Sequence, residues 1–390
     1  MRLDLAGLPF DTGGRLLLQK ALAGLPPGSR VTVTGRDPFL ALHLRAWCRS
    51  AGHGTTPAAA GAVEVTKGRQ DADRWARAER AGEPGAVVRR PPAHWGLAAR
   101  GARLEAGGPE PVYDLADRDI VWADLAPRLY AHAAAAQWDP ATAVPWDTAF
   151  TLPADVEAAV VQVMTYLVEN EQAALVIPAR LLTRIHPHFR EVVGLLAVQA
   201  ADEARHVEVF TRRALHSGGQ MGTSSAGGRA SLASLLAEPD FTLASFLLSV
   251  LGEGSFLSLL AFLDRHAPDP LTRSVTRLAR VDEARHVAFG VAHLEHQSAT
   301  DRTMLGRLRD AIERRHDVLL DTAGLNQDVF DALLLLAAGD WSPEALTRGH
   351  RAVLKLQADM DETRRRHLTR LGFPDDEAAE LSALHTRNFM

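Results

Sequence analysis

The chain has 390 residues, of which 46% are hydrophobic and 23% charged, a composition typical of globular proteins. Its formal net charge of -5 argues against a nucleic-acid surface, so a nucleic-acid partner is not expected. The single cysteine, Cys48, excludes an intramolecular disulfide. Neither a leader pattern nor an uninterrupted apolar run of about 18 residues is visible, so we expect a cytoplasmic protein that does not enter a membrane.

Strands and helices alternate over residues 1–82, which we predict to be the first domain. β-Branched residues predict strands at 30–34 and 62–66, and shorter segments at 2–5 and 75–79 are also predicted to be strands. Apolar residues at helical spacing predict helices at 16–22 and 37–48. The predicted order is therefore that of a small β-α-β-α-β-β sandwich.

Several short runs in this region match a known pattern: Asp4-Leu5-Ala6-Gly7-Leu8, Lys20-Ala21-Leu22, Leu25-Pro26-Pro27-Gly28, Asp37-Pro38, Ala46-Trp47-Cys48 and Gly52-His53. With them the region resembles a TusA-like sulfur carrier. The persulfide-bearing Cys-Pro pair of that family would fall on Phe10-Asp11, which cannot carry sulfane sulfur. Cys48 lies among apolar neighbours and is predicted to be a buried thiol. We expect a degenerate, non-catalytic domain that docks a partner, the second domain or a second subunit.

Residues 83–120 are rich in Gly, Pro, Arg and Ala and are predicted to be a linker or wrapping arm. Residues 121–390 are predicted to be almost entirely helical, which makes the whole an α+β two-domain chain. The expected helices are 124–137, four long ones at 154–182, 187–215, 241–265 and 270–297, and further C-terminal ones at 302–320, 328–338, 343–371 and 376–384. A polar crossover at 216–240, with a short helix at 232–237, would join the two helix pairs of a four-helix bundle.

One pentapeptide occurs twice within the four long helices. Asp202-Glu203-Ala204-Arg205-His206 is repeated as Asp282-Glu283-Ala284-Arg285-His286, 80 residues later. In each copy Glu and His stand at i and i+3, so they share one face of a helix. A single such pair is usually a solvent-facing contact, but two identical copies indicate a common task.

Each copy is preceded, about 30 residues upstream, by a glutamate in an apolar stripe. These are Glu171 and Glu253. A buried carboxylate is costly unless it has a partner, and a metal ion is such a partner. Glu169 lies on a more polar stripe of the same helix and is predicted to be a surface residue.

Together these residues predict a dinuclear metal site. Four carboxylates and two imidazoles from four helices form the ligand set of bundle-held di-iron and di-manganese proteins. The predicted ligands and reactive-site residues are Glu171, Glu203, His206, Glu253, Glu283 and His286. Asp202 and Asp282 are predicted to orient the imidazole of the opposite motif, paired with Arg205 and Arg285.

With this ligand pattern, residues 120–390 resemble the ferritin-like carboxylate-bridged di-iron superfamily, and the repeated motif looks most like its oxygenase branches. The resemblance implies that each motif's Glu and His bind iron and that the preceding Asp supports them. A ligand set without thiolate suits two iron ions or an Fe/Mn pair.

The expected function is activation of dioxygen to hydroxylate, N-oxygenate or desaturate a small organic substrate. Electrons would come from a separate donor protein, and we expect a homodimer. Two alternatives stay open at this stage. One is a ferritin-like iron-handling or peroxide-scavenging protein, and the other is a tRNA-modifying hydroxylase.

Overall fold

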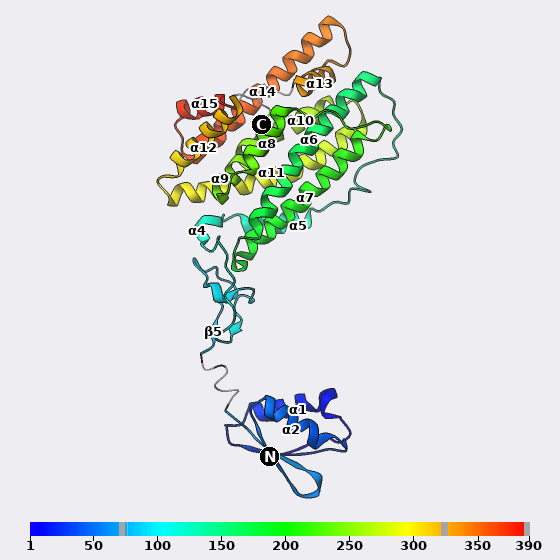
Figure 1. Ribbon diagram of the computed structural model, residues 1–390. Helices are drawn as coiled ribbons and strands as arrows, with labels where there is room; N and C mark the ends of the chain where they lie inside the picture. Colours follow the sequence, from blue (N-terminus) through cyan, green and yellow to red (C-terminus); the bar gives the residue numbers. More distant parts are fainter. Residues whose placement is uncertain (70–74, 76, 321–326, 386–390) are drawn as a thin grey trace. The chain divides into compact units, whose positions relative to one another are not determined.

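The computed structural model describes residues 1–69, 75, 77–320 and 327–385 (Figure 1). The chain divides into two compact units, which are described separately. The first unit contains Met1–Ala86 and His94–Pro111, and the second contains Val87–Ala93 and Val112–Met390. This division assigns parts of the segment 83–120 to both units. Among the described residues the structure is mostly helical, with two small sheets in the first unit.

The first unit is built on a four-stranded sheet in the order β1-β2-β4-β3. β1 (Arg2–Asp4) runs parallel to β2 (Arg30–Thr34), and β4 (Val63–Thr66) runs antiparallel to both β2 and β3 (Gly54–Pro57). The helices α1 (Arg15–Ala23) and α2 (Leu40–Ser50) contribute apolar side chains to one core with β2 and β4.

The strand predicted at 75–79 is wrong. The fourth strand is β3, which forms a hairpin with β4, and Ala58 N donates to Ala62 O at 2.8 Å across the turn. Trp75 and residue 77 lie in turns, and residue 76 lies outside the described residues. Glu79 begins β5 (Glu79–Arg80), which pairs with β6 (Arg103–Leu104) in a separate two-stranded sheet. A short hairpin connection favours pairing between strands that are adjacent in the sequence. β3 therefore pairs with β4 and is the fourth strand of the sheet, in place of the predicted strand at 75–79.

Cys48 is fully buried in the core of the first unit. Burial raises the pKa of its thiol to about 11, so the thiolate is scarce at neutral pH. Phe10 is also buried, and Asp11 is exposed. Cys48 therefore has the environment of an inert core residue.

The second unit centres on four long helical segments. These are α6 (Ala154–Leu182), α7 (Arg190–Ala214), the continuous run of α9 (Phe241–Ser245), η5 (Phe246–Glu253) and α10 (Gly254–His266), and α11 (Pro270–Thr300). α6 packs along α7, and α11 packs against both η5–α10 and α7 (Figure 1). Asp240 and Asp269 cap the third and fourth segments by accepting the backbone N–H groups of Leu243 and Thr272.

Shorter helices surround this bundle. α8 (Ala226–Leu236) lies in the crossover between the helix pairs, and it begins earlier than the predicted 232–237 because Ser225 caps it. α4 (Arg118–Val121) and α5 (Ala126–Ala135) precede the bundle. α12 (Met304–Leu320), α13 (Gln327–Ala338), α14 (Pro343–Leu371) and α15 (Asp375–Ala383) follow it.

The third segment is not the uninterrupted α-helix that was predicted. Its central eight residues, η5, are π-helical, with one extra residue in each hydrogen-bonded turn. Glu253 is the last residue of η5, and Gly252 and Gly254 flank it. Glycine lowers helix stability, which is consistent with a local change of helical pitch. The π-helical turns therefore set the direction in which Glu253 points.

The segment Phe241–His266 is long and apolar enough to cross a membrane by length and composition, but 78% of its most apolar window is buried within the protein. A core helix has the same properties. Its apolarity is accounted for by its position between α11 and α14.

Candidate metal centre

The six side chains predicted as ligands lie in one buried cluster. α6 supplies Glu171, α7 supplies Glu203 and His206, η5 supplies Glu253, and α11 supplies Glu283 and His286. None of the six is more than 5% exposed. Glu169, two residues before Glu171, is only partly buried and lies outside the cluster.

The cluster consists of two overlapping groups of possible ligands. The first group is Glu171, Glu203, His206 and Glu283, and the second is Glu203, Glu253, Glu283 and His286. Within each group the donor atoms lie within 4.8 Å of one another. Glu203 and Glu283 belong to both groups, so their carboxylates are placed to bridge two ions, while Glu171 and Glu253 each belong to one.

Both imidazoles turn Nδ1 toward the glutamates. His206 Nδ1 lies 3.1 Å from a carboxylate oxygen of Glu203 and 3.4 Å from one of Glu171 and one of Glu283. His286 Nδ1 lies 3.0 Å from Glu203 and 3.5 Å from Glu283. These short approaches make Nδ1 the atom that each histidine would offer to a metal ion.

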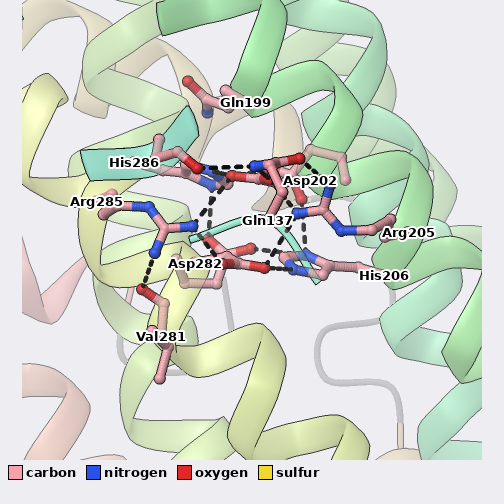
Figure 2. A network of polar contacts seen from close by, with 12 residues as sticks. Gln137, Gln199, Asp202, Arg205, His206, Val281, Asp282, Arg285 and His286 are labelled. Atoms are coloured by element: carbon pink, nitrogen blue, oxygen red, sulfur yellow. Dashed lines mark hydrogen bonds and ion pairs between the residues drawn. The ribbon is translucent and has the colours of Figure 1, made fainter. Parts of the chain in front are cut away.

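The two aspartates contact the imidazoles crosswise between the motifs (Figure 2). His206 Nε2 lies 3.2 Å from Asp282 Oδ2, and His286 Nε2 lies 3.2 Å from Asp202 Oδ2. A carboxylate at Nε2 holds the proton on that nitrogen and leaves Nδ1 free to bind a metal ion. Each motif therefore orients the histidine of the other.

Two arginines neutralise these aspartates. Arg205 bonds to Asp202 and Arg285 bonds to Asp282 within the same helix, and Arg285 Nη2 also lies 3.4 Å from Asp202 Oδ2 (Figure 2). Two carboxylates and two guanidinium groups carry no net charge, so this network orients the histidines without adding charge to the site.

Two further residues of this network were missed from the sequence. Gln137 Nε2 donates to Asp202 at 3.0 Å, and Trp138 Nε1 donates to Asp282 at 2.7 Å. The Trp138 ring also stacks on His206 and lies against the Arg205 guanidinium. Both residues follow α5 and reach the motifs only through tertiary packing, so local pattern gives no signal for them. Gln199 likewise donates to Glu253 at 3.2 Å.

The pKa values of the cluster reflect four carboxylates that lie close together in a buried space. Burial, followed by the charges of Glu203 and Glu283, raises the pKa of Glu171 well above its ordinary value. Burial and the charge of Glu283 raise the pKa of Glu253 in the same way. Bound cations would favour the ionised form of both side chains, as a neighbouring positive charge always does.

The imidazoles show the opposite response. Burial acts to lower the pKa of His206 and of His286, but the surrounding carboxylates outweigh it, and both pKa values are well above the ordinary one. Burial also acts to raise the pKa of Asp282, yet the contacts with His206 and Trp138 lower it to about 2. In the absence of metal the raised pKa values favour protonated, positively charged histidines. Bound divalent cations would supply the positive charge in their place.

Unsatisfied buried atoms test whether a metal pair fits. Within the described residues, these cluster atoms make no well-aligned hydrogen bond: Glu171 Oε1, Glu253 Oε2, both carboxylate oxygens of Glu283, and the pair Glu203 Oε1 and His286 Nδ1, which approach each other at 3.0 Å. Buried polar atoms without partners are rare and costly. All six are oxygen or imidazole donors of the kind that bind Fe(II) and Mn(II). The four carboxylate charges would balance two divalent ions, so the residues present fit a dinuclear site.

A small pocket of about 30 Å³ adjoins the cluster. Glu171, Glu253 and Glu283 form part of its wall. Most of the remaining wall is apolar and comes from α6, α8, η5 and α10: Ala174, Leu232, Leu235, Leu247, Leu248 and Phe256. The pocket is therefore bounded by glutamates of the cluster on one side and by largely apolar residues elsewhere.

Comparison with known proteins does not assign a family. No protein-family model matches the chain, and no curated protein matches it. Among solved structures, a variant of an R2-like ligand-binding oxidase with an aerobically reconstituted Mn/Fe cofactor is 19% identical, covers 66% of this chain and 94% of its own, and gives a TM-score of 0.44. A second variant, anaerobically reconstituted, is 19% identical with coverage of 62% and 94% and a TM-score of 0.45. These likenesses are too distant to carry function to this chain.

Proposed function

We propose that this protein is a dinuclear non-haem iron or Fe/Mn oxidoreductase that activates dioxygen and oxidises a small organic substrate. The observation that carries the proposal is the pair of overlapping ligand groups, which share Glu203 and Glu283. Two ions held side by side in a buried bundle core are the arrangement that di-metal carboxylate proteins use.

The protein's own residues would do three things. Glu171 and His206 would hold one ion, Glu253 and His286 the other, and the shared glutamates would bridge them. Asp202 and Asp282 would fix the imidazole orientation. The apolar wall of the pocket would keep bulk water from the reacting groups. The bound metal pair would supply the redox chemistry with dioxygen.

The proposal extends to the reaction partners. The adjoining pocket lies against three of the four glutamates, so a substrate in it would lie directly beside the metal ions. Such chemistry needs electrons, and we propose a separate donor protein in the cytoplasm as their source. Hydroxylation, N-oxygenation and desaturation all use the same ligand set.

Dioxygen uptake by the Fe(II)-loaded protein tests this proposal. The wild-type protein would be loaded with Fe(II) without oxygen, freed of excess metal, and mixed with dioxygen while uptake and optical spectra are recorded. We expect iron-dependent uptake that is lost in a Glu203→Gln/Glu283→Gln variant and kept in Glu169→Gln, which removes a nearby carboxylate outside the cluster. Oxidation of many iron equivalents per chain, with the iron retained, would instead indicate iron storage.

A further inference from the structure

A second polar feature of the pocket is not explained by metal binding. Arg315, on α12, lines the pocket and is only 6% exposed. Within the described parts of the chain, its hydrogen bonds go to serines of α8: to Ser231 O at 3.2 Å, Ser231 Oγ at 2.8 Å and Ser234 Oγ at 2.9 Å. No ion pair joins it to a carboxylate in the part of the chain that the structure describes. Among the described residues, the groups that bond to this buried positive charge are therefore neutral.

Two of the other buried arginines are paired with carboxylates, Arg213 with Glu157 and Asp269, and Arg285 with Asp282. Arg364, like Arg315, bonds to serine hydroxyls, but it does not line the pocket beside the glutamates. Burying a charge without a counter-ion is costly. Burial lowers the pKa of Arg315 to about 10, so it is still charged at neutral pH. A neutral side chain would hold the two serines at lower cost, and Arg315 lines a pocket, so its guanidinium is placed to meet an anion that enters there.

A third polar group faces the same space. Asn170, next to the predicted ligand Glu171, lines the pocket and is 8% exposed. Its Nδ2 donates to the carbonyl oxygen of Tyr166 at 2.7 Å, while its Oδ1 has no hydrogen-bond partner among the residues that the structure describes. The pocket thus offers a cation and an open hydrogen-bond acceptor on walls that are otherwise apolar, with the glutamate cluster on a further side.

We infer that Arg315 binds the carboxylate of the substrate, and that the substrate is an organic acid with an apolar body. This inference rests on the function proposed above. The guanidinium would form charge-assisted hydrogen bonds to the carboxylate, and the leucines of α8 and η5 would contact the apolar body. The acid would then be oriented with its carboxylate at Arg315 and another part of the molecule beside the metal ligands.

The free space of about 30 Å³ is smaller than any such acid, so one wall has to move. α8 is the candidate, because it supplies Leu232 and Leu235 and is bonded to Arg315 through Ser231 and Ser234. A substrate carboxylate bound to the Arg315 guanidinium would replace its hydrogen bonds to Ser231 and Ser234. α8 could then move outward. Binding and opening of the pocket would then be one event.

Calorimetric titration with a matched set of ligands tests the inference. Hexanoate, 1-hexanol and hexylamine share an apolar chain and differ in the charge of the head group. Each would be titrated into metal-free and anaerobic Mn(II)-loaded protein. We expect hexanoate to bind more tightly than hexanol, and hexylamine to bind least. In Arg315→Gln we expect hexanoate binding to weaken roughly 10- to 100-fold, as for loss of a charged hydrogen bond, with hexanol little changed.

Two further variants separate binding from folding. Arg315→Lys keeps the charge and should retain part of the preference for hexanoate over hexanol. Arg314→Gln removes the adjacent, exposed arginine and should bind as the wild type does. If Arg315 variants do not fold, the ligand order in the wild-type protein still decides, because equal binding of hexanoate and hexanol would overturn the inference.

The outcomes also separate this inference from the proposed function. Hexanoate binding to metal-loaded protein that is unaffected by Arg315→Gln would show that the carboxylate binds elsewhere, and the inference would fail while the metal centre stands. Selective, Arg315-dependent hexanoate binding by a protein that takes up no metal would support the inference about Arg315 and contradict the proposed metal centre.

Discussion

The crossed contacts between Asp202 and His286 and between Asp282 and His206 link the two halves of the site at the scale of single residues. Each histidine is oriented by a residue of the opposite helix, so neither half can be oriented without the other. α7 and α11 are thereby held in register at the motifs, and the geometry of the donor atoms depends on two carboxylates that do not themselves belong to the ligand groups.

Removing one of these carboxylates should weaken metal binding. In Asp202→Asn the contact at His286 Nε2 loses its charge, and we expect the affinity for Mn(II) to fall roughly 10- to 100-fold. Competition with a chromogenic chelator would measure it. Asp264→Asn, in a partly exposed ion pair with Arg277, is the control and should bind as the wild type does. Equal affinities for all three proteins would contradict the orienting role.

His293 gives a pH dependence that is separate from metal binding. It is fully buried, lies 2.9 Å from the carbonyl oxygen of Trp122, and lies 3.2 Å from the Thr242 hydroxyl. Burial lowers its pKa from 6.5 to about 4. Between these values the unfolded chain binds the extra proton, so the stabilisation is present above pH 6.5 and is lost as the pH falls toward 4.

The shift of His293 corresponds to a loss of about 3 kcal/mol between pH 6.5 and 4. Denaturant unfolding of the metal-free protein at a series of pH values would measure it. The variant His293→Gln cannot gain the proton, so its free energy of unfolding should fall less steeply over this range. Parallel pH curves for the two proteins would show that His293 does not contribute.

At the scale of the elements, η5 is held in place by a close approach of α11. A Cβ atom added to Gly290 on α11 would lie 2.4 Å from Cβ of Ser249 on η5, which no real contact allows. The Ser249 side chain also acts to lower the pKa of the Glu253 carboxyl group, against the effect of burial. The absence of a side chain at position 290 therefore helps to place a predicted metal ligand.

Substitution of Gly290 by alanine should separate the two helices. We expect Gly290→Ala to destabilise the protein by about 1–3 kcal/mol, as overpacking does, and to weaken metal binding because Ser249 and Glu253 shift. Thermal unfolding and chelator competition would measure both effects. Gly306→Ala, in open space on α12, should be neutral or stabilising. A stable Gly290→Ala protein with wild-type metal affinity would contradict this packing argument.

The sequence predicted the long helices well and the connections poorly. The predicted bounds 154–182 and 343–371 are those observed, because apolar periodicity and capping act locally. The strand at 54–57 was missed because it begins with Gly54 and ends with Pro57, which are disfavoured in strands, although its partner β4 is close in the sequence. The π-helical form of η5 was missed because local pattern gives no sign of its packing against α11. At the site, the repeated motif and the apolar stripes identified the six clustered residues, but Gln137, Trp138 and Arg315 reach it only through tertiary packing.

At the scale of the whole molecule, all six cluster residues lie in the second unit. The second unit has its own apolar cores and its own capped helices. We therefore expect a shortened chain that begins at residue 78 to fold and to bind as many metal ions as the full chain. Elemental analysis and thermal unfolding of both proteins would test this, and a metal content that drops on shortening would assign the first unit a part in building the site.

The central claim is that the two overlapping ligand groups hold two metal ions, and metal stoichiometry tests it most directly. The protein would be loaded with Fe(II) or Mn(II) without oxygen, freed of excess metal, and measured by elemental analysis beside Glu203→Gln/Glu283→Gln and Glu169→Gln. Two ions per chain in the wild type and in Glu169→Gln, with almost none in the double variant, is the predicted result. No more metal in the wild type than in the double variant, with all three proteins folded, would contradict the account and leave the repeated motif a structural one.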